Sequence, residues 1–323
     1  MANLCLEGST VRTHSLNSTQ YNGLLGFVTG SYVYKEEEMA IRVPVDLQLA
    51  DGTTKSVILG LKNLTETSAN NSIQSQLDKA VMDGNAKATT ECLRLGADCN
   101  VKTRSGAIPL ICATQDGFVD VARALVNGGA DVNHRDDEGH TALYFAASNG
   151  NVKLIKALAK LGGSVHASNS LGMSPVFIAA EHGHVGAIRA LAGLGTDVNA
   201  RNCSGGNPIY VAAEGQHVNA IKALAELGAN INTATTRGFS PLYMAAQRNF
   251  VEVIRALAAL GADVNAASPV HKSTPVCAAA GQGHVDAIRV LAKLGADVNF
   301  WFGVSPVFIA AQQGHVGAIR ALA

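Results

Sequence analysis

Apolar residues recur every three or four positions from about residue 73 to residue 323, which is the spacing of one face of an α-helix. In the segment VGAIRALAGL, residues 185–194, Val185, Ile188 and Leu191 fall on one arc of a helix, and Arg189 falls on the opposite arc. This spacing predicts a short amphipathic helix with one buried side.

A second short helix is predicted just before it, ending at about Glu181. Ser174 can accept hydrogen bonds from free backbone N–H groups as the N-cap, and Pro175 suits the first helical position. Gly183 separates the two helices, and Gly195 suits a left-handed turn after the second one. The segment therefore predicts a helix–turn–helix unit.

This unit repeats along the chain at an almost constant interval. A signature similar to Asp-Val-Asn recurs every 33 residues, with a last step of 34, and its copies end at Asn100, Asn133, His166, Asn199, Asn232, Asn265 and Asn299. Helices this short are unstable alone, so each unit must bury its apolar face against its neighbours. The repeat predicts a one-dimensional solenoid.

The repeated sequence pattern resembles the ankyrin repeat family over about residues 70–323. The pattern is G-x-S/T-P-L-x-x-A-A-x-x-G-H-x-x-x-I-x-x-L-x-x-x-G-A-D-V-N. The resemblance implies antiparallel helix pairs, a projecting loop or β-hairpin between units, and a curved stack. One position departs from the family, whose His after T-P-L tethers the turn by hydrogen bonds. Here we expect packing to replace part of that tether, because the position holds Ile111, Tyr144, Phe177, Tyr210, Tyr243, Cys277 and Phe308.

Eight units are expected. Their approximate ranges are 73–100, 101–133, 134–166, 167–199, 200–232, 233–265, 266–299 and an incomplete 300–323. The first lacks the S/T-P-L opening, as expected of a capping unit, and the seventh has one extra residue near 269–272. The last stops inside its second helix, so we expect either a fragment of a longer chain or a frayed final helix.

Residues 1–66 follow a different pattern, with β-prone runs separated by turn-forming residues: VRTHSL, LLGFVTGSYVY, AIRVPVDLQL and KSVILGL. The strings LNSTQYNGLLGFV, RVPVDL and DGTTKSV are similar to those of a small SH3-like module. The predicted fold class is therefore a mainly α solenoid preceded by a small all-β, SH3-like barrel domain. Residues 67–72 are expected to be a linker, and the barrel to serve as a spacer or peptide-binding module.

Composition and charge narrow the classes of function. The chain is 47% hydrophobic and 15% charged, so it can bury a core. Lys plus Arg and Asp plus Glu number 25 each, which argues against a general nucleic-acid or anionic-membrane binder. The sequence shows no secretory signal and no apolar run of about 20 residues. We expect a cytoplasmic protein, with the nucleus as the alternative.

No motif of catalysis, cofactor binding or metal binding appears in the sequence, so no enzyme activity and no cofactor are expected. The six cysteines are scattered without a CxxC pair, which favours free thiols in a reducing compartment. Four histidines share one repeat position, but helices about 8–10 Å apart cannot bring them to one metal ion. They are His184, His217, His284 and His315.

A ladder of cations occupies the polar side of the second helices. Its members are Arg123, Lys156, Arg189, Lys222, Arg255, Arg289 and Arg320. Acidic residues lie three positions before some of them, and such pairs are typical of a solvated outer face. We expect this ladder to be solvated rather than to form a nucleic-acid groove.

The positions at which the repeats differ are the candidates for partner recognition, because the ankyrin resemblance implies that loop tips and first helices line the concave side. The candidates are Arg135, Asp137, His140, Asn149, Leu171, Met173, Glu181, His182, Glu214, Arg237, Phe239, Gln247, Arg248, His271, Trp301 and Phe302. Trp is a frequent interface anchor, although Trp301 could equally cover the shortened eighth loop.

The function expected from the sequence is a monomeric scaffold or adaptor that binds another protein through the concave face and loop tips. Two alternatives remain open at this point. One is a nucleic-acid-associated adaptor that uses the small barrel or the cation ladder. The other is the regulatory region of a longer enzyme or channel.

Overall fold

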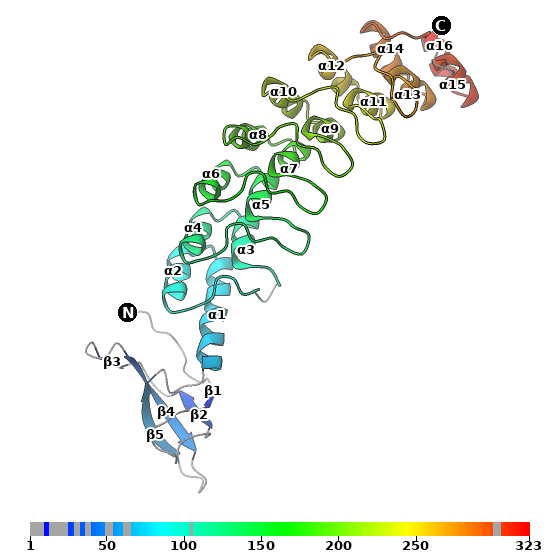
Figure 1. Cartoon of the computed structure of the whole chain (residues 1–323). Helices are drawn as coiled ribbons and strands as arrows, with labels where there is room; N and C mark the ends of the chain where they lie inside the picture. The colour runs from blue at the N-terminus through cyan, green and yellow to red at the C-terminus, as the bar shows by residue number, and fades with distance from the viewer. Residues whose placement is uncertain are drawn as a thin grey trace. The chain divides into compact units, whose positions relative to one another are not determined.

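The computed structural model describes the backbone of five strand segments between residues 10 and 60, and then residues 66–103, 106–299 and 305–323 (Figure 1). The chain divides into two compact units, Met1–Ser105 and Gly106–Ala323, which we call the N-terminal and C-terminal units. Each unit is described by itself.

The strands of the N-terminal unit are β1 (Thr10–Arg12), β2 (Leu25–Val28), β3 (Val33–Lys35), β4 (Ala40–Gln48) and β5 (Thr54–Gly60). All the pairings among them are antiparallel. The longest strand, β4, is the centre of the sheet, since it pairs with β2 and β3 at different points along its length and with β5 over residues 42–48. The outermost strand beyond β2 is β1.

The prediction of a preceding all-β, SH3-like barrel domain is wrong. A barrel closes only when its terminal strands pair, and within the described strands β1 pairs with β2 and β5 pairs with β4, which leaves an open sheet. The strands also do not form a compact unit of their own, because that unit extends to Ser105 and includes two helices. The short β-prone runs predicted strands, but they did not indicate whether the two edge strands of the sheet pair with each other.

The two helices of the N-terminal unit are α1 (Glu66–Met82) and α2 (Ala86–Arg94), which pack against each other. The stretch 67–72, expected to be a linker, is therefore helical. Leu77 and Val81 of α1 are fully buried, and the Asn85 side chain caps α2 by accepting a hydrogen bond from the Ala88 N–H at 3.0 Å. The first repeat thus folds in the same compact unit as the strands.

The C-terminal unit consists of helix pairs stacked side by side (Figure 1). The first helices of the pairs are α3 (Pro109–Gln115), α5 (Ala142–Ser148), α7 (Pro175–Glu181), α9 (Pro208–Glu214), α11 (Pro241–Gln247), α13 (Pro275–Gly281) and α15 (Pro306–Gln312). The second helices are α4 (Val119–Asn127), α6 (Val152–Lys160), α8 (Val185–Ala192), α10 (Val218–Glu226), α12 (Val251–Ala259), α14 (Val285–Lys293) and α16 (Val316–Leu322). Successive first helices contact one another, and so do successive second helices. The loops between units project beside the first helices.

The helices begin and end largely as the sequence predicts. Thr141, Ser240 and Ser305 each accept a hydrogen bond from the backbone N–H three residues on, at 3.1–3.3 Å. Ser174 occupies the same position but makes no such bond, and its buried hydroxyl oxygen has no partner. The predicted capping bond of Ser174 is therefore wrong, although α7 still begins at Pro175, which suits the first turn without it.

The core runs through the whole stack. The centre of the apolar arc predicted for the second helices is buried: Ile188 and Leu191 of α8 are fully inaccessible to solvent, whereas Val185 is half-buried. Burial of a side chain of this size contributes about 1.5–3 kcal/mol. Because every unit supplies such residues between its neighbours, the core is continuous without a single centre.

The position that departs from the family pattern packs as expected along most of the stack. Phe177 and Cys277 are almost completely buried there. At the last unit Phe308 is 55% exposed instead, because α15 contacts the preceding first helix α13 on one side and its own partner α16. Packing replaces the missing histidine only where a unit has neighbours on both sides.

Candidate partner-binding surface

The loop tips are joined to one another through backbone hydrogen bonds. The N–H of Ser170 donates to the carbonyl oxygen of Glu138 at 3.1 Å, and the N–H of Cys203 donates to Leu171 at 2.9 Å. In the same way, the N–H of Thr236 donates to the carbonyl oxygen of Ser204 at 2.9 Å. Four successive loops therefore form a connected strip rather than independent fingers.

Each loop is also closed internally by a short polar side chain. The Asn169 side-chain oxygen accepts from the N–H groups of Leu171 and Met173 at 3.0 and 2.9 Å. Asn202 and Asp136 make the same type of turn in neighbouring loops. The tips are consequently presented in a fixed conformation, which lowers the entropy lost when a partner binds.

Leu171 and Met173 lie on this strip, as the sequence predicted. The Leu171 side chain is 58% exposed, whereas Met173 is half-buried. An exposed apolar side chain on a loop tip that faces a neighbouring tip can serve as a contact for a partner. Leu171 is therefore a candidate anchor.

The structure brings Phe239 and His271 together, although they belong to different loops. Their rings stack with centroids 4.9 Å apart, and Phe239 also stacks on Tyr243 of α11 at 5.1 Å. Val270, which is 57% exposed, adjoins the same loop, because a Cβ added at Gly238 would lie 3.1 Å from a Val270 methyl group. We call Phe239, Tyr243, Val270 and His271 the aromatic cluster.

Sequence reasoning missed Val270. The extra residue of the seventh loop shifts its register, so comparison with the other repeats gave no equivalent position. The exposed apolar Val beside His271 was the available signal.

His140 has a different environment from His271. Its Nδ1–H donates to the Asp136 carboxylate at 3.1 Å, and its Nε2 accepts from the Asn169 amide at 3.2 Å. The ring also stacks on Tyr144 with centroids 4.3 Å apart. With its side chain only 12% exposed, His140 holds two loops together and presents little surface.

The remaining loop candidates that the structure describes are charged and exposed. Arg135 donates to the Ser168 carbonyl oxygen at 2.6 Å, so it connects two successive loops. Asp137 and Arg237 are exposed at their tips. Trp301 and Phe302 lie outside the described residues.

The first helices add polar side chains beside the loops. Arg248 and Glu214 from successive units form an ion pair with 2.8 Å between their charged atoms. Asn149 donates to the Gln115 carbonyl oxygen at 2.8 Å. Glu181 and His182 are exposed at the end of α7, and Gln247 is half-buried at the end of α11.

Three tyrosines beneath this surface are held in the neutral form. Burial, followed by the nearby carboxylates of Glu181, Glu138 and Asp136, raises the pKa of Tyr144 to about 12. Burial likewise raises the pKa of Tyr210 and of Tyr243. These hydroxyl groups are therefore weak acids with no tendency toward nucleophilic chemistry near neutral pH.

Three of the four histidines that share one repeat position join neighbouring units. Nε2 of His184 lies 2.9 Å from the Ser148 carbonyl oxygen of the preceding unit, and His284 and His315 make equivalent bonds at 3.0 and 3.2 Å. Within the described residues, no group of three or more His, Cys, Asp or Glu side chains is placed to hold a metal ion. The histidines thus act as structural turn residues.

The five described cysteines are free thiols, and four of them are buried. Burial raises the pKa of the Cys92 and Cys99 thiols, so neither is an activated nucleophile. Among the described helices, none combines the length and the apolar character needed to cross a membrane.

The geometry defines a class of protein, a solenoid of stacked helix pairs with a continuous strip of loop tips. A sequence profile for ankyrin repeats (3 copies) matches residues 77–169, 129–202, 154–235 and 176–268, which together span more than half of the chain. The chain belongs to the ankyrin repeat family.

Among solved structures, the chain is similar to the crystal structure of the ankyrin repeat domain of Bcl-3, described as a unique member of the IkappaB protein family. The two are 27% identical with a TM-score of 0.57, and the match covers 62% of this chain and 92% of that chain. A search of the curated proteins found no match. Ankyrin repeats indicate a protein–protein interaction scaffold.

Proposed function

We propose that this protein is a non-catalytic scaffold that holds a partner protein against its first helices and loop tips, on the concave side of the ankyrin stack. The observation that carries the proposal is the combination of exposed apolar groups with fixed loop geometry. Leu171 and Val270 are each more than half exposed, yet their loops are closed by internal hydrogen bonds.

The chemistry of this surface favours a partner with both apolar and charged groups. The aromatic cluster offers a stacked apolar platform, and Arg237 is exposed on the loop that carries Phe239. A central apolar contact surrounded by polar groups is the usual anatomy of a protein interface. We further propose that the protein acts as a monomer in a reducing compartment, the cytoplasm or the nucleus, in keeping with its free thiols.

The test is quantitative capture of partners on the immobilised full chain, followed by mass spectrometry. Phe239→Ala and Arg237→Glu should each lower the recovery of specific partners by about tenfold, which corresponds to loss of one hot-spot contact of roughly 1.4 kcal/mol. Arg289→Glu, an exposed substitution on α14, is the matched control and should leave recovery within twofold. Unchanged capture by both loop variants would remove the proposed surface.

A further inference from the structure

A groove lies between two second helices, α4 and α6, away from the loop tips. Its cavity volume is about 500 Å³, within the roughly 300–1,000 Å³ typical of ligand pockets. We call this the outer groove, and its lining consists of Val119, Arg123, Asn127, Lys153, Lys156, Ala157, Lys160 and Leu161.

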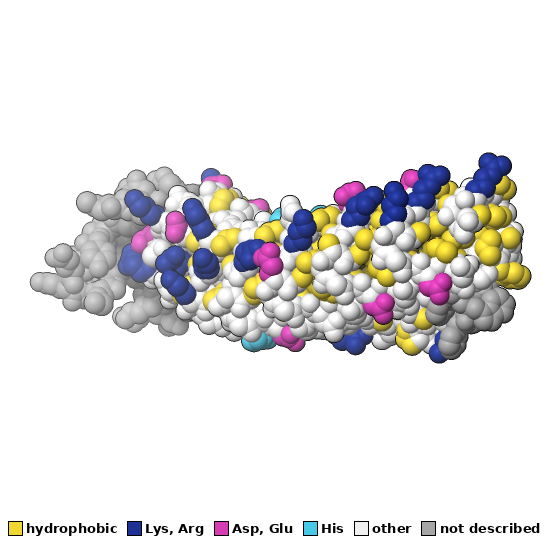
Figure 2. All heavy atoms as spheres, turned by 90° about the horizontal axis from the view of Figure 1, so that it is seen from above, with side chains coloured by type: hydrophobic (Ala, Val, Ile, Leu, Met, Phe, Trp, Pro, Cys, Tyr) yellow, Lys and Arg dark blue, Asp and Glu magenta, His cyan; other side chains and the backbone are white. Residues whose placement is uncertain are grey.

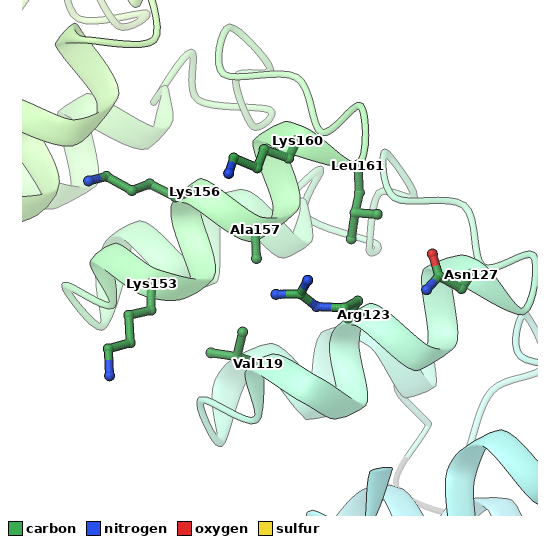
Figure 3. A pocket seen from close by; sticks show the side chains of 8 residues that line it. All are labelled: Val119, Arg123, Asn127, Lys153, Lys156, Ala157, Lys160 and Leu161. Carbon is green, nitrogen blue, oxygen red and sulfur yellow. The ribbon is translucent and has the colours of Figure 1, made fainter. Parts of the chain in front are cut away.

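The outer groove has an apolar floor and a cationic rim. In Figure 3, Val119 and Ala157 lie between the facing helices, with Arg123 extending into the same space, while the amino groups of Lys153 and Lys156 point outward. The lining contains four cations and no acidic residue. An anionic group would therefore meet attraction from both helices.

The four cations of the groove have no ion-pair partner among the described residues, whereas two other members of the cation ladder do. Arg189 of α8 is paired with Glu226 at 2.6 Å, and Arg255 of α12 lies 3.7 Å from Glu252. All seven cations of the ladder are exposed, as expected, and Lys and Arg recur along one side of the array in Figure 2. The positive charge of the groove is therefore not neutralised by an ion pair among the described residues.

The sequence of α6, VKLIKALAK, explains the charge. It holds no acidic residue, and Lys153, Lys156 and Lys160 are spaced so that they share a helix face. Like charges at i, i+4 destabilise a helix, as Lys156 and Lys160 do here. A bound anion would offset this repulsion between the two lysines, which favours anion binding at this face of α6.

We propose that the outer groove binds an acidic segment of a protein partner, with one apolar side chain on the floor between Val119 and Ala157 and carboxylates against the lysines. The apolar floor suits an apolar side chain of the peptide. A single-stranded nucleic acid is less favoured, because none of the lining residues is aromatic and able to stack a base. The site is independent of the loop-tip surface, so either can fail without the other.

The experiment measures fluorescence anisotropy of the full chain with a labelled 12-residue peptide that contains six Glu and three Leu. The double variant Arg123→Glu, Lys156→Glu should weaken binding at least tenfold. The matched control, Lys222→Glu with Arg289→Glu, changes the net charge equally at exposed positions outside the groove and should stay within twofold. Equal loss in both double variants would contradict a specific site.

A second variant separates the groove from simple charge attraction. Ala157→Met fills the floor without changing charge and should weaken peptide binding at least threefold, whereas unchanged affinity would overturn the proposal. Oligo-dT and phosphatidylserine vesicles form two further arms, and tighter groove-dependent binding of either would also overturn it. Circular dichroism and the urea midpoint establish that each variant is folded, and Lys153→Ala with Lys160→Ala replaces the charge reversals if they unfold the chain.

Discussion

At the residue scale, the turn between the two helices of a unit depends on one left-handed backbone position. Glycine usually occupies it, and Gly183 has φ +72°. The absence of a side chain matters as well, because a Cβ at Gly183 would lie 2.6 Å from Cγ of His217 in the next unit. A single position thus serves both the turn and the contact between units.

Two units have a non-glycine residue at this position, Gln216 with φ 60° and Asn249 with φ 59°. A left-handed conformation costs an L-residue about 1–2 kcal/mol. Glycine avoids this cost but loses roughly 0.5–1 kcal/mol, because its unfolded chain has more conformational entropy. We therefore predict that Gln216→Gly raises the free energy of unfolding by about 0.5–1 kcal/mol, measured by urea denaturation.

The matched control is Gly183→Ala, one unit earlier. It adds a Cβ where backbone conformation and the His217 ring both oppose it, so stability should fall by about 1 kcal/mol or more. A Gln216→Gly variant that is less stable than the unchanged protein would show that this turn is not strained.

At the element scale, the last residue of the Asp-Val-Asn signature connects neighbouring units. The Asn199 amide donates to the Gly228 carbonyl oxygen at 3.2 Å, and its side-chain oxygen accepts from the Asn230 N–H at 2.7 Å. Asn133 and Asn265 make the same pair of bonds. In these units the last residue of the signature bridges to the following turn.

His166 replaces this asparagine in one unit, and the two bonds are not formed there. We predict that His166→Asn, at an exposed position, stabilises the protein by about 1 kcal/mol, since each net hydrogen bond contributes roughly 0.5–1.5 kcal/mol. Thermal and urea unfolding measure the gain. The reciprocal variant Asn199→His should lose a similar amount, and equal stability of both variants and the parent would argue against the bridge.

Sequence periodicity predicted the helix pairs well, because repeated caps, glycines and apolar arcs all favour the same local structure. It could not predict that Ser174 makes no capping bond, which depends on side-chain orientation rather than residue type. Nor could it predict the stacking of Phe239 on His271, because these residues are 32 positions apart in different loops. The barrel prediction failed for a related reason, since strand runs do not specify which sheet edges meet.

At the scale of the whole molecule, each described unit of the C-terminal stack is stabilised chiefly by its neighbours. First helices contact first helices, and second helices contact second helices, from unit to unit. Such an architecture leaves the exposed loop positions free to vary, because residues that recur in the repeats carry most of the stacking. The exposed apolar tips are therefore sites where variation can serve binding.

The most direct test of the scaffold is hydrogen–deuterium exchange of the full chain with and without a captured partner. Amides in the loops near 168–174, 235–240 and 268–273 should become protected in the complex, because the partner covers Leu171 and the aromatic cluster. A stable complex that leaves exchange in all three loops unchanged would contradict the account.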